Sequence, residues 1–250
     1  GDPSYKQVWH QFIEESLTHC EEIYDKLNIT LSRADLDAES RYNDDLEGIT
    51  ELLNSKGLLS ESDGAKVVFL SEFVGKDGKP LPVIIQKSDG GYLYSTTDLA
   101  AIKFRSEELD ADRSLYVVDA RQSLHFQQVF AVSKSAQLTS DKISLEHIAY
   151  GTMMGSDGTP FKTRSGDTVK LIDLLNESVR RAYDLVTEKN PGLDEELCLS
   201  IAKKVGIASV KYADLSKNRT SDYIFDWSRM LSFEGNTAPY LMYAYARIKS

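Results

Sequence analysis

Hydrophobic and polar positions along the chain predict an alternation of helices and strands. Residues 5–26 carry apolar side chains at spacings of three and four, which is typical of an amphipathic helix. A polar stretch follows from residue 32 to residue 63, with nine acidic and three basic residues between Arg33 and Asp63. Its inner part, residues 46–53, favours a short helix. We expect this stretch to be the solvated acidic surface of an inserted subdomain.

Short runs of β-branched and aromatic residues then predict strands. Residues 66–70 and 83–85 predict the two strands of a hairpin, because an Asp-Gly turn signal lies between them at 77–78. Residues 92–94 predict another strand. A helix is expected over 96–105, with Ser95, Thr96 or Thr97 as its N-cap.

The middle of the chain alternates between the two kinds of element. A strand at 115–118, a helix at 124–135 and a strand at 147–150 indicate a parallel sheet of doubly wound type, buried on both faces. Ligands of such sheets bind at the carboxyl ends of the strands, so functional side chains are expected just after residues 94, 118 and 150. Beyond these, residues 169–188, 194–213 and 239–250 predict helices.

Composition and charge narrow the class of protein. The 250 residues carry a net charge of −10 and are 41% hydrophobic, as in a folded globular domain. No apolar run is long enough to span a bilayer, so no membrane partner is expected. Two cysteines, Cys20 and Cys198, are expected to be reduced thiols in a cytoplasmic protein. The four histidines are scattered, so we expect no protein-bound metal.

A phenol and a carboxylate follow the strand predicted at 92–94. Tyr94 and Asp98 are four residues apart, so both can converge on one ligand. The charge of Asp98, in the first turn of the expected helix, is favoured by the helix dipole. A carboxylate and a phenol suit a planar cation with several N–H donors. The alternative is that Asp98 caps the helix and Tyr94 only packs.

A second polar group follows the strand predicted at 115–118. Gln122 can both donate and accept hydrogen bonds, and His125 lies where it can face the same crevice. The alternative is a surface histidine, with Arg121 doing no more than pairing with Asp119.

Two further stretches have the composition of phosphate-binding sites. The loop 155–166 contains glycines, hydroxyls and two cations, a combination that suits a polyphosphate, although a plain surface loop has the same composition. Residues 201–220 hold five cations against one acid. They are either a contact for a nucleic-acid backbone or a solvated helix face.

At these places the chain resembles the arginyl-tRNA synthetases of the bacterial type. The matching blocks occur in the family's order over essentially the whole chain, at residues 92–98, 119–125, 161–166, 211–219, 222–227 and 233–240. The resemblance implies a class I synthetase: an α/β fold in which half of a Rossmann-like parallel sheet carries an inserted subdomain and is followed by α-helical segments. It further implies ATP-dependent conversion of arginine to arginyl-adenylate, then transfer to the 3′ end of the cognate tRNA. The family uses Mg²⁺ with ATP and needs tRNA even for the first step.

The resemblance also implies roles for individual residues. Tyr94 and Asp98 would bind the guanidinium group of arginine, and Gln122 would line the same pocket. ATP would be bound by His125, near the adenosine, and by residues of the loop that takes the place of the class I K-M-S-K-S loop: Lys162, Thr163, Arg164 and Ser165. Phe161 and Arg164 replace the two lysines of that consensus, which leaves open whether Lys162 or Arg164 stabilises the transferring phosphates. The tRNA would contact Lys203, Lys211, Lys217 and Arg219.

The expected domain organisation combines the pattern with the resemblance. We expect a helical, acidic inserted region at 1–65, a β-hairpin connective segment at 66–91, the second half of the catalytic domain at 92–168, a helical stem-contact region at 169–236 and the start of the anticodon-binding domain at 237–250. The parent enzyme is expected to be a monomer.

One departure from the family concerns the signature H-x-G-H, which class I enzymes need and this chain lacks. We expect a fragment of a longer enzyme that is inactive alone. The alternative is a noncatalytic tRNA- or partner-binding fragment. A glutamyl-type synthetase gives no reason for Asp98 in an amino-acid pocket, and a cysteinyl type requires a zinc site that the scattered histidines and cysteines do not supply.

Overall fold

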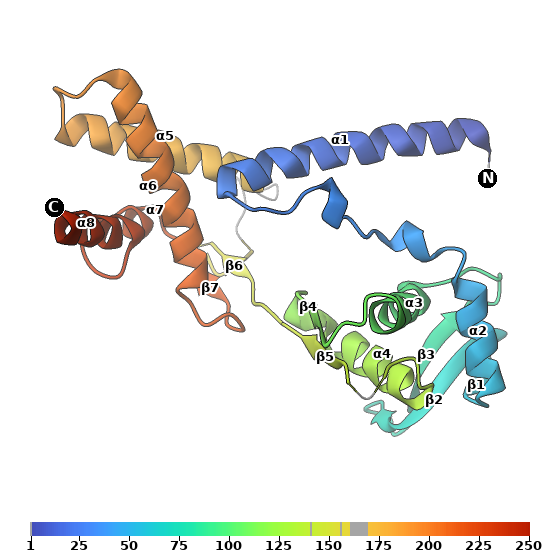
Figure 1. Cartoon of the computed structure of the whole chain (residues 1–250). Coiled ribbons are helices and arrows are strands. Elements are labelled where there is room, and N and C mark those ends of the chain that lie inside the picture. The colour runs from blue at the N-terminus through green and yellow to red at the C-terminus, as the bar shows by residue number, and fades with distance from the viewer. Residues whose placement is uncertain (1, 141, 156, 161–169) are drawn as a thin grey trace. The chain divides into compact units, whose positions relative to one another are not determined.

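The computed structural model describes residues 2–140, 142–155, 157–160 and 170–250 (Figure 1). The chain divides into two compact units. We call Asp37–Tyr150 the sheet unit, and Gly1–Leu36 together with Gly151–Ser250 the helical unit.

In its described residues, the sheet unit holds two small sheets and three α-helices. Its elements in chain order are the 3₁₀ helix η2 (Glu39–Tyr42), α2 (Leu46–Ser55), β1 (Leu59–Ser62), β2 (Ala65–Val74), β3 (Pro80–Gln86), α3 (Tyr94–Glu107), β4 (Arg113–Tyr116), the 3₁₀ helix η3 (Ala120–Gln122), α4 (Ser123–Ser135) and β5 (Ser144–His147). Strands β1, β2 and β3 form an antiparallel sheet in that order. Strands β4 and β5 pair in parallel, with Tyr116 opposite His147. The predicted parallel pair is therefore confirmed. The predicted burial on both faces is wrong, because residues alternate between exposed and buried along β4 and Leu115 is 52% exposed.

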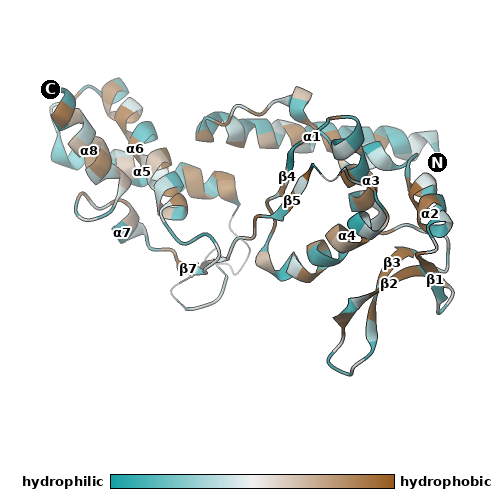
Figure 2. Ribbon diagram, turned by 60° about the horizontal axis from the view of Figure 1, so that its bottom comes forward, coloured by the Kyte–Doolittle hydropathy of each residue, from teal (hydrophilic) through white to brown (hydrophobic). Residues whose placement is uncertain are grey.

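The core of the sheet unit lies where α3 packs against α2, α4 and β3. Ile85, Leu99, Ile102 and Val129 are completely shielded from solvent. The apolar parts of β2 and β3 appear in brown in Figure 2. Complete burial of one such aliphatic side chain contributes roughly 1.5–3 kcal/mol. The start of α3, which carries Asp98, is thus anchored to a well-packed core.

The helical unit is built around α5 and α6. Its elements are α1 (Pro3–Leu27), the 3₁₀ helix η1 (Arg33–Asp35), β6 (Met153–Met154), α5 (Leu171–Lys189), α6 (Glu195–Leu215), β7 (Tyr223–Ile224), α7 (Trp227–Met230) and α8 (Ala238–Lys249). Helices α5 and α6 pack along each other, and α8 packs on α6. Strands β6 and β7 form a short parallel pair.

The α5–α6 contact depends on one small residue. The hydroxyl of Ser178 on α5 donates to the carbonyl of Gly206 on α6, at 2.7 Å. A Cβ atom at Gly206 would lie 2.8 Å from the Cα atom of Val179. The two backbones can approach this closely only because position 206 has no side chain.

The predicted strand at 92–94 is wrong. Tyr92 makes only an isolated bridge to Gln86, and α3 already begins at Tyr94, where the amides of Thr96 and Thr97 donate to the carbonyl of Leu93. The aromatic run resembles a strand, but the hydroxyl-bearing residues that follow it bond to β3 and start the helix. Asp98 consequently lies in the second turn of α3. Because the dipole effect falls off within the first turn, the expected support from the helix dipole is wrong as well.

Two other strands end earlier than predicted, and one strand was missed. β4 ends at Tyr116, two residues before the predicted end at 118, and β5 ends at His147, three residues before the predicted end at 150. Asp119 and Tyr150 still pair as an isolated parallel bridge. Strand β1, at Leu59–Ser62, lies in the polar stretch where the pattern gave only a helix and a solvated surface.

The close approach of α5 and α6 gives a stability prediction. Gly206→Ala should lower the free energy of unfolding of the helical unit by about 1–3 kcal/mol, because the new methyl group forces two packed backbones apart. The matched control is Gly48→Ala on α2, where a Cβ atom meets nothing within 4 Å. That change should stabilise by about 0.5–1 kcal/mol, since alanine loses less chain entropy in a helix. Urea unfolding of both variants measures the difference; equal effects would contradict the packing argument.

Candidate active site

A cleft of about 930 Å³ opens at the carboxyl end of β4 in the sheet unit. It is lined by side chains of η2, α3, β4, η3 and α4, and by the residues that connect them: Glu39, Tyr94, Asp98, Arg105, Ser114, Leu115, Tyr116, Val117, Val118, Arg121, Gln122, His125 and Phe126. Tyr94, Asp98, Gln122 and His125, which the sequence analysis took from two separate motifs, therefore line one cleft. Their individual roles remain predictions.

Asp98 and His125 are in direct contact. His125 Nε2 lies 2.7 Å from Asp98 Oδ2. The side chain of Asp98 is 28% exposed and that of His125 is 17% exposed, so Asp98 is largely shielded but still open to the cleft. The ring of Tyr94 packs edge-on against the imidazole at 4.8 Å between centroids. A carboxylate held in this way is a binding group for a cationic ligand.

Hydroxyl groups anchor the start of α3 to the neighbouring strand. Ser95 Oγ donates to the carbonyl of Ile84, and Thr96 Oγ1 donates to the carbonyl of Ile85. Both side chains are buried, with Thr96 wholly so. The prediction that Ser95, Thr96 or Thr97 caps the helix is wrong: the N-cap is Leu93, and the two bonded hydroxyls tie the first turn to β3 instead.

Gln122 lies at the end of η3, the turn that leads from β4 into α4. Asp119 caps this turn by accepting from the amide of Arg121, and it also pairs with the guanidinium of Arg121 at 2.8 Å. These hydrogen bonds hold the pKa of Asp119 at about 2. The Asp119–Arg121 pair, given as an alternative from the sequence, is present. It fixes the shape of the turn that carries Gln122 to the cleft.

Two further charged residues line the cleft, Arg105 and Glu39, and neither was expected from the sequence. Arg105 donates to the hydroxyl of Tyr116 at 2.9 Å, and burial raises the pKa of that phenol. Arg105 also lies 4.0 Å from Asp37, which precedes η2. Glu39 of η2 belongs to the stretch that the charge pattern assigned to a solvated surface. No local motif marks these residues, because only the fold brings η2 to the end of α3.

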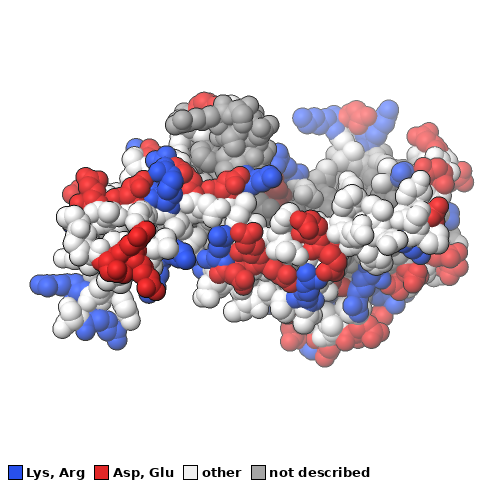
Figure 3. Space-filling view, turned by 90° about the horizontal axis from the view of Figure 1, so that it is seen from above, with Lys and Arg blue, Asp and Glu red and all other residues white. Residues whose placement is uncertain are grey.

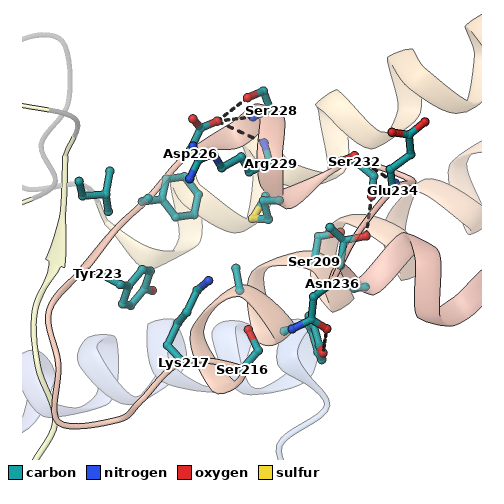
Figure 4. A pocket seen from close by; sticks show the side chains of 17 residues that line it. Ser209, Ser216, Lys217, Tyr223, Asp226, Ser228, Arg229, Ser232, Glu234 and Asn236 are labelled. Carbon is teal, nitrogen blue, oxygen red and sulfur yellow. Dashed lines mark hydrogen bonds between the residues drawn. The ribbon is translucent and has the colours of Figure 1, made fainter.

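The helical unit contains a cavity of its own, of about 410 Å³ (Figure 4). Tyr223 donates to Asp214 at 3.0 Å, and burial, followed by the charge of Asp214, raises the pKa of Tyr223. Asp226 caps α7 by accepting from the amides of Ser228 and Arg229. Lys217 extends toward this cavity from the turn after α6.

The predicted tRNA contacts have different surroundings. Lys203 is exposed on α6. Lys211 Nζ donates to the carbonyl of Leu27 at 2.7 Å, so it gives a hydrogen-bond partner to a carbonyl oxygen at the C-terminal end of α1. Arg219 accepts at its carbonyl from the amide of Gly151. In the face shown in Figure 3, acidic and basic side chains of the described residues are interspersed. A role of the four cations in tRNA binding remains a prediction.

The remaining predictions concern the ATP-binding loop, metal ligands and membrane-spanning helices. Lys162, Thr163, Arg164 and Ser165, the predicted ATP-binding residues of the loop, lie outside the described residues. In the described part of the chain, no three His, Cys, Asp or Glu side chains gather to hold a metal ion. No described helix is long and apolar enough to cross a bilayer.

Comparison with known proteins identifies the family. The family of class I tRNA synthetases for arginine, described as "tRNA synthetases class I (R), catalytic domain", matches residues 1–227. The chain is 61% identical over 248 residues to the arginine–tRNA ligase of Shewanella loihica, a match that covers 99% of this chain and 43% of that protein. It is 60% identical over 250 residues to the arginine–tRNA ligase of Laribacter hongkongensis, covering 100% of this chain and 44% of that protein.

Solved structures agree with the sequence relatives. The arginyl-tRNA synthetase of Plasmodium falciparum superposes with a TM-score of 0.82 at 30% identity, over 99% of this chain and 40% of that one. The arginyl-tRNA synthetase of Thermus thermophilus, at 23% identity and a TM-score of 0.62 over 81% of this chain and 39% of that one, supports the fold. The chain belongs to the class I arginyl-tRNA synthetase family, with its Rossmann-like α/β fold, and the resemblance seen in the sequence is confirmed. It spans about 43% of the length of the curated relatives.

The anchoring of α3 gives a prediction for the site. Thr96→Val should lower the free energy of unfolding of the sheet unit by about 1–2 kcal/mol, because it removes a buried hydroxyl that satisfies the carbonyl of Ile85. Thr97→Val is the matched control, since Thr97 is only partly buried on the same turn. Thermal unfolding compares the two; an equal loss in both would show that the hydroxyl of Thr96 does not anchor the helix.

Proposed function

We propose that this chain forms the arginine-recognising part of an arginine–tRNA ligase. The observation that carries the proposal is the Asp98 carboxylate, held by His125 at 2.7 Å and open to a cleft that Tyr94 and Gln122 also line. The curated relatives named above are arginine–tRNA ligases, and the chain matches them over nearly all of its length. These facts favour a ligase over a noncatalytic tRNA- or partner-binding fragment.

Recognition of arginine follows from the chemistry of the cleft. The guanidinium group is a planar cation with five N–H donors, and a carboxylate accepts two of them side by side. Tyr94 and Gln122 can satisfy further donors or stack on the plane. Citrulline has nearly the same shape but no charge, so discrimination between the two depends on the charge of Asp98.

The reaction needs no protein nucleophile. The carboxylate of arginine attacks the α-phosphorus of ATP and expels pyrophosphate. A hydroxyl of the terminal adenosine of tRNA then attacks the carbonyl carbon of the mixed anhydride and expels AMP. The protein aligns the reactants and stabilises the developing charge. We propose that Mg²⁺ enters with the phosphates of ATP, as hard cations prefer oxygen ligands. We further propose that the ligase acts as a monomer in the cytoplasm and requires its cognate tRNA for the first step.

Replacement of the carboxylate tests arginine recognition. In the complete ligase that carries these residues, Asp98→Asn should lower kcat/KM for arginine. The loss of transition-state stabilisation should be about 2–4 kcal/mol, because the guanidinium loses its counter-charge. Asp112→Asn, which removes an exposed partner of Lys142, is the control and should leave kcat/KM unchanged. Aminoacylation kinetics measure both variants; an unchanged value for Asp98→Asn would refute the assignment.

A second test concerns the 250 residues alone. They lack the H-x-G-H sequence that class I enzymes need, so they should not catalyse arginine-dependent exchange of pyrophosphate into ATP, even with tRNA added. The complete ligase should do so under the same conditions. Robust exchange by the isolated chain would contradict the proposal that catalysis needs the rest of the enzyme.

A further inference from the structure

His125 was expected near the adenosine end of ATP, but its imidazole lies on Asp98. We propose that His125 is a positioning residue for arginine recognition: its imidazole donates an N–H to Asp98 and sets the orientation in which the carboxylate meets the guanidinium. This inference rests on the proposed arginine recognition and adds a residue to it.

The geometry supports this direction of the hydrogen bond. The 2.7 Å separation is in the range of charge-assisted hydrogen bonds. An ionised carboxylate can only accept, so the hydrogen lies on Nε2 of His125. The bond occupies Oδ2 of Asp98 from the side of α4. The remaining lone pairs of the carboxylate stay available to a ligand in the cleft.

The imidazole itself is held by aromatic rings on two sides. Tyr94 meets it edge-on at 4.8 Å and Phe126 at 5.0 Å, both between ring centroids. Because His125 is on α4 and Asp98 on α3, the hydrogen bond joins the two helices that line the cleft. Free rotation of the carboxylate would otherwise reduce the gain from a two-point contact with the guanidinium.

The test uses aminoacylation by the complete ligase, with KM measured for arginine and for ATP at about pH 8. His125→Gln keeps an N–H donor, so its KM for arginine should stay within about threefold of the wild-type value. His125→Phe removes the donor and should raise KM for arginine about tenfold at pH 8, with kcat at saturation and KM for ATP nearly unchanged.

The control is His19→Gln, which removes an exposed histidine of α1 and should keep the wild-type KM for arginine. An unchanged KM for arginine in His125→Phe, or an equal rise in His125→Gln and His125→Phe, would overturn the inference and leave arginine recognition intact. A wild type that shows no preference for arginine would instead overturn the proposed function, and the inference with it. If His125→Phe does not fold, His125→Ala, which also removes the donor, takes its place in the comparison.

Discussion

The contact between Asp98 and His125 is the interaction on which the rest of the site depends. It brings a carboxylate from α3 and an imidazole from α4 to 2.7 Å, at the point where both helices meet the end of β4. A shielded carboxylate without a partner would be costly, and one that is paired only within the protein would have no use for a ligand. Asp98 avoids both of these problems, because His125 occupies one of its oxygens while the carboxylate stays open to the cleft.

The packing of the sheet unit holds this contact in place. The hydroxyls of Ser95 and Thr96 tie the first turn of α3 to β3, and Leu99 and Ile102 fix the next turns in the core. On the other side, the Asp119–Arg121 pair shapes the turn that delivers Gln122 and α4. The side chains of the site are thus held by well-packed neighbours, which keep the charged groups in fixed positions.

The sequence predicts most of this architecture, because periodicity reports which face of an element is buried. The long helices and the parallel β4–β5 pair follow from it, and so does the cleft at the carboxyl end of β4. The pattern fails at Tyr92–Tyr94, where an aromatic run resembles a strand but the hydroxyls after it start a helix. It also misses Glu39 and Arg105, and it does not pair His125 with Asp98. These are contacts between segments distant in sequence, which local spacing does not encode.

The most direct test of the central claim is a calorimetric titration of the complete ligase with arginine and with citrulline at the same pH and salt concentration. The two ligands differ in charge and hardly in shape, so the ratio of their dissociation constants reports the contribution of the carboxylate. The account predicts that arginine binds at least about a hundredfold more tightly than citrulline. Equal dissociation constants for the two ligands would contradict it.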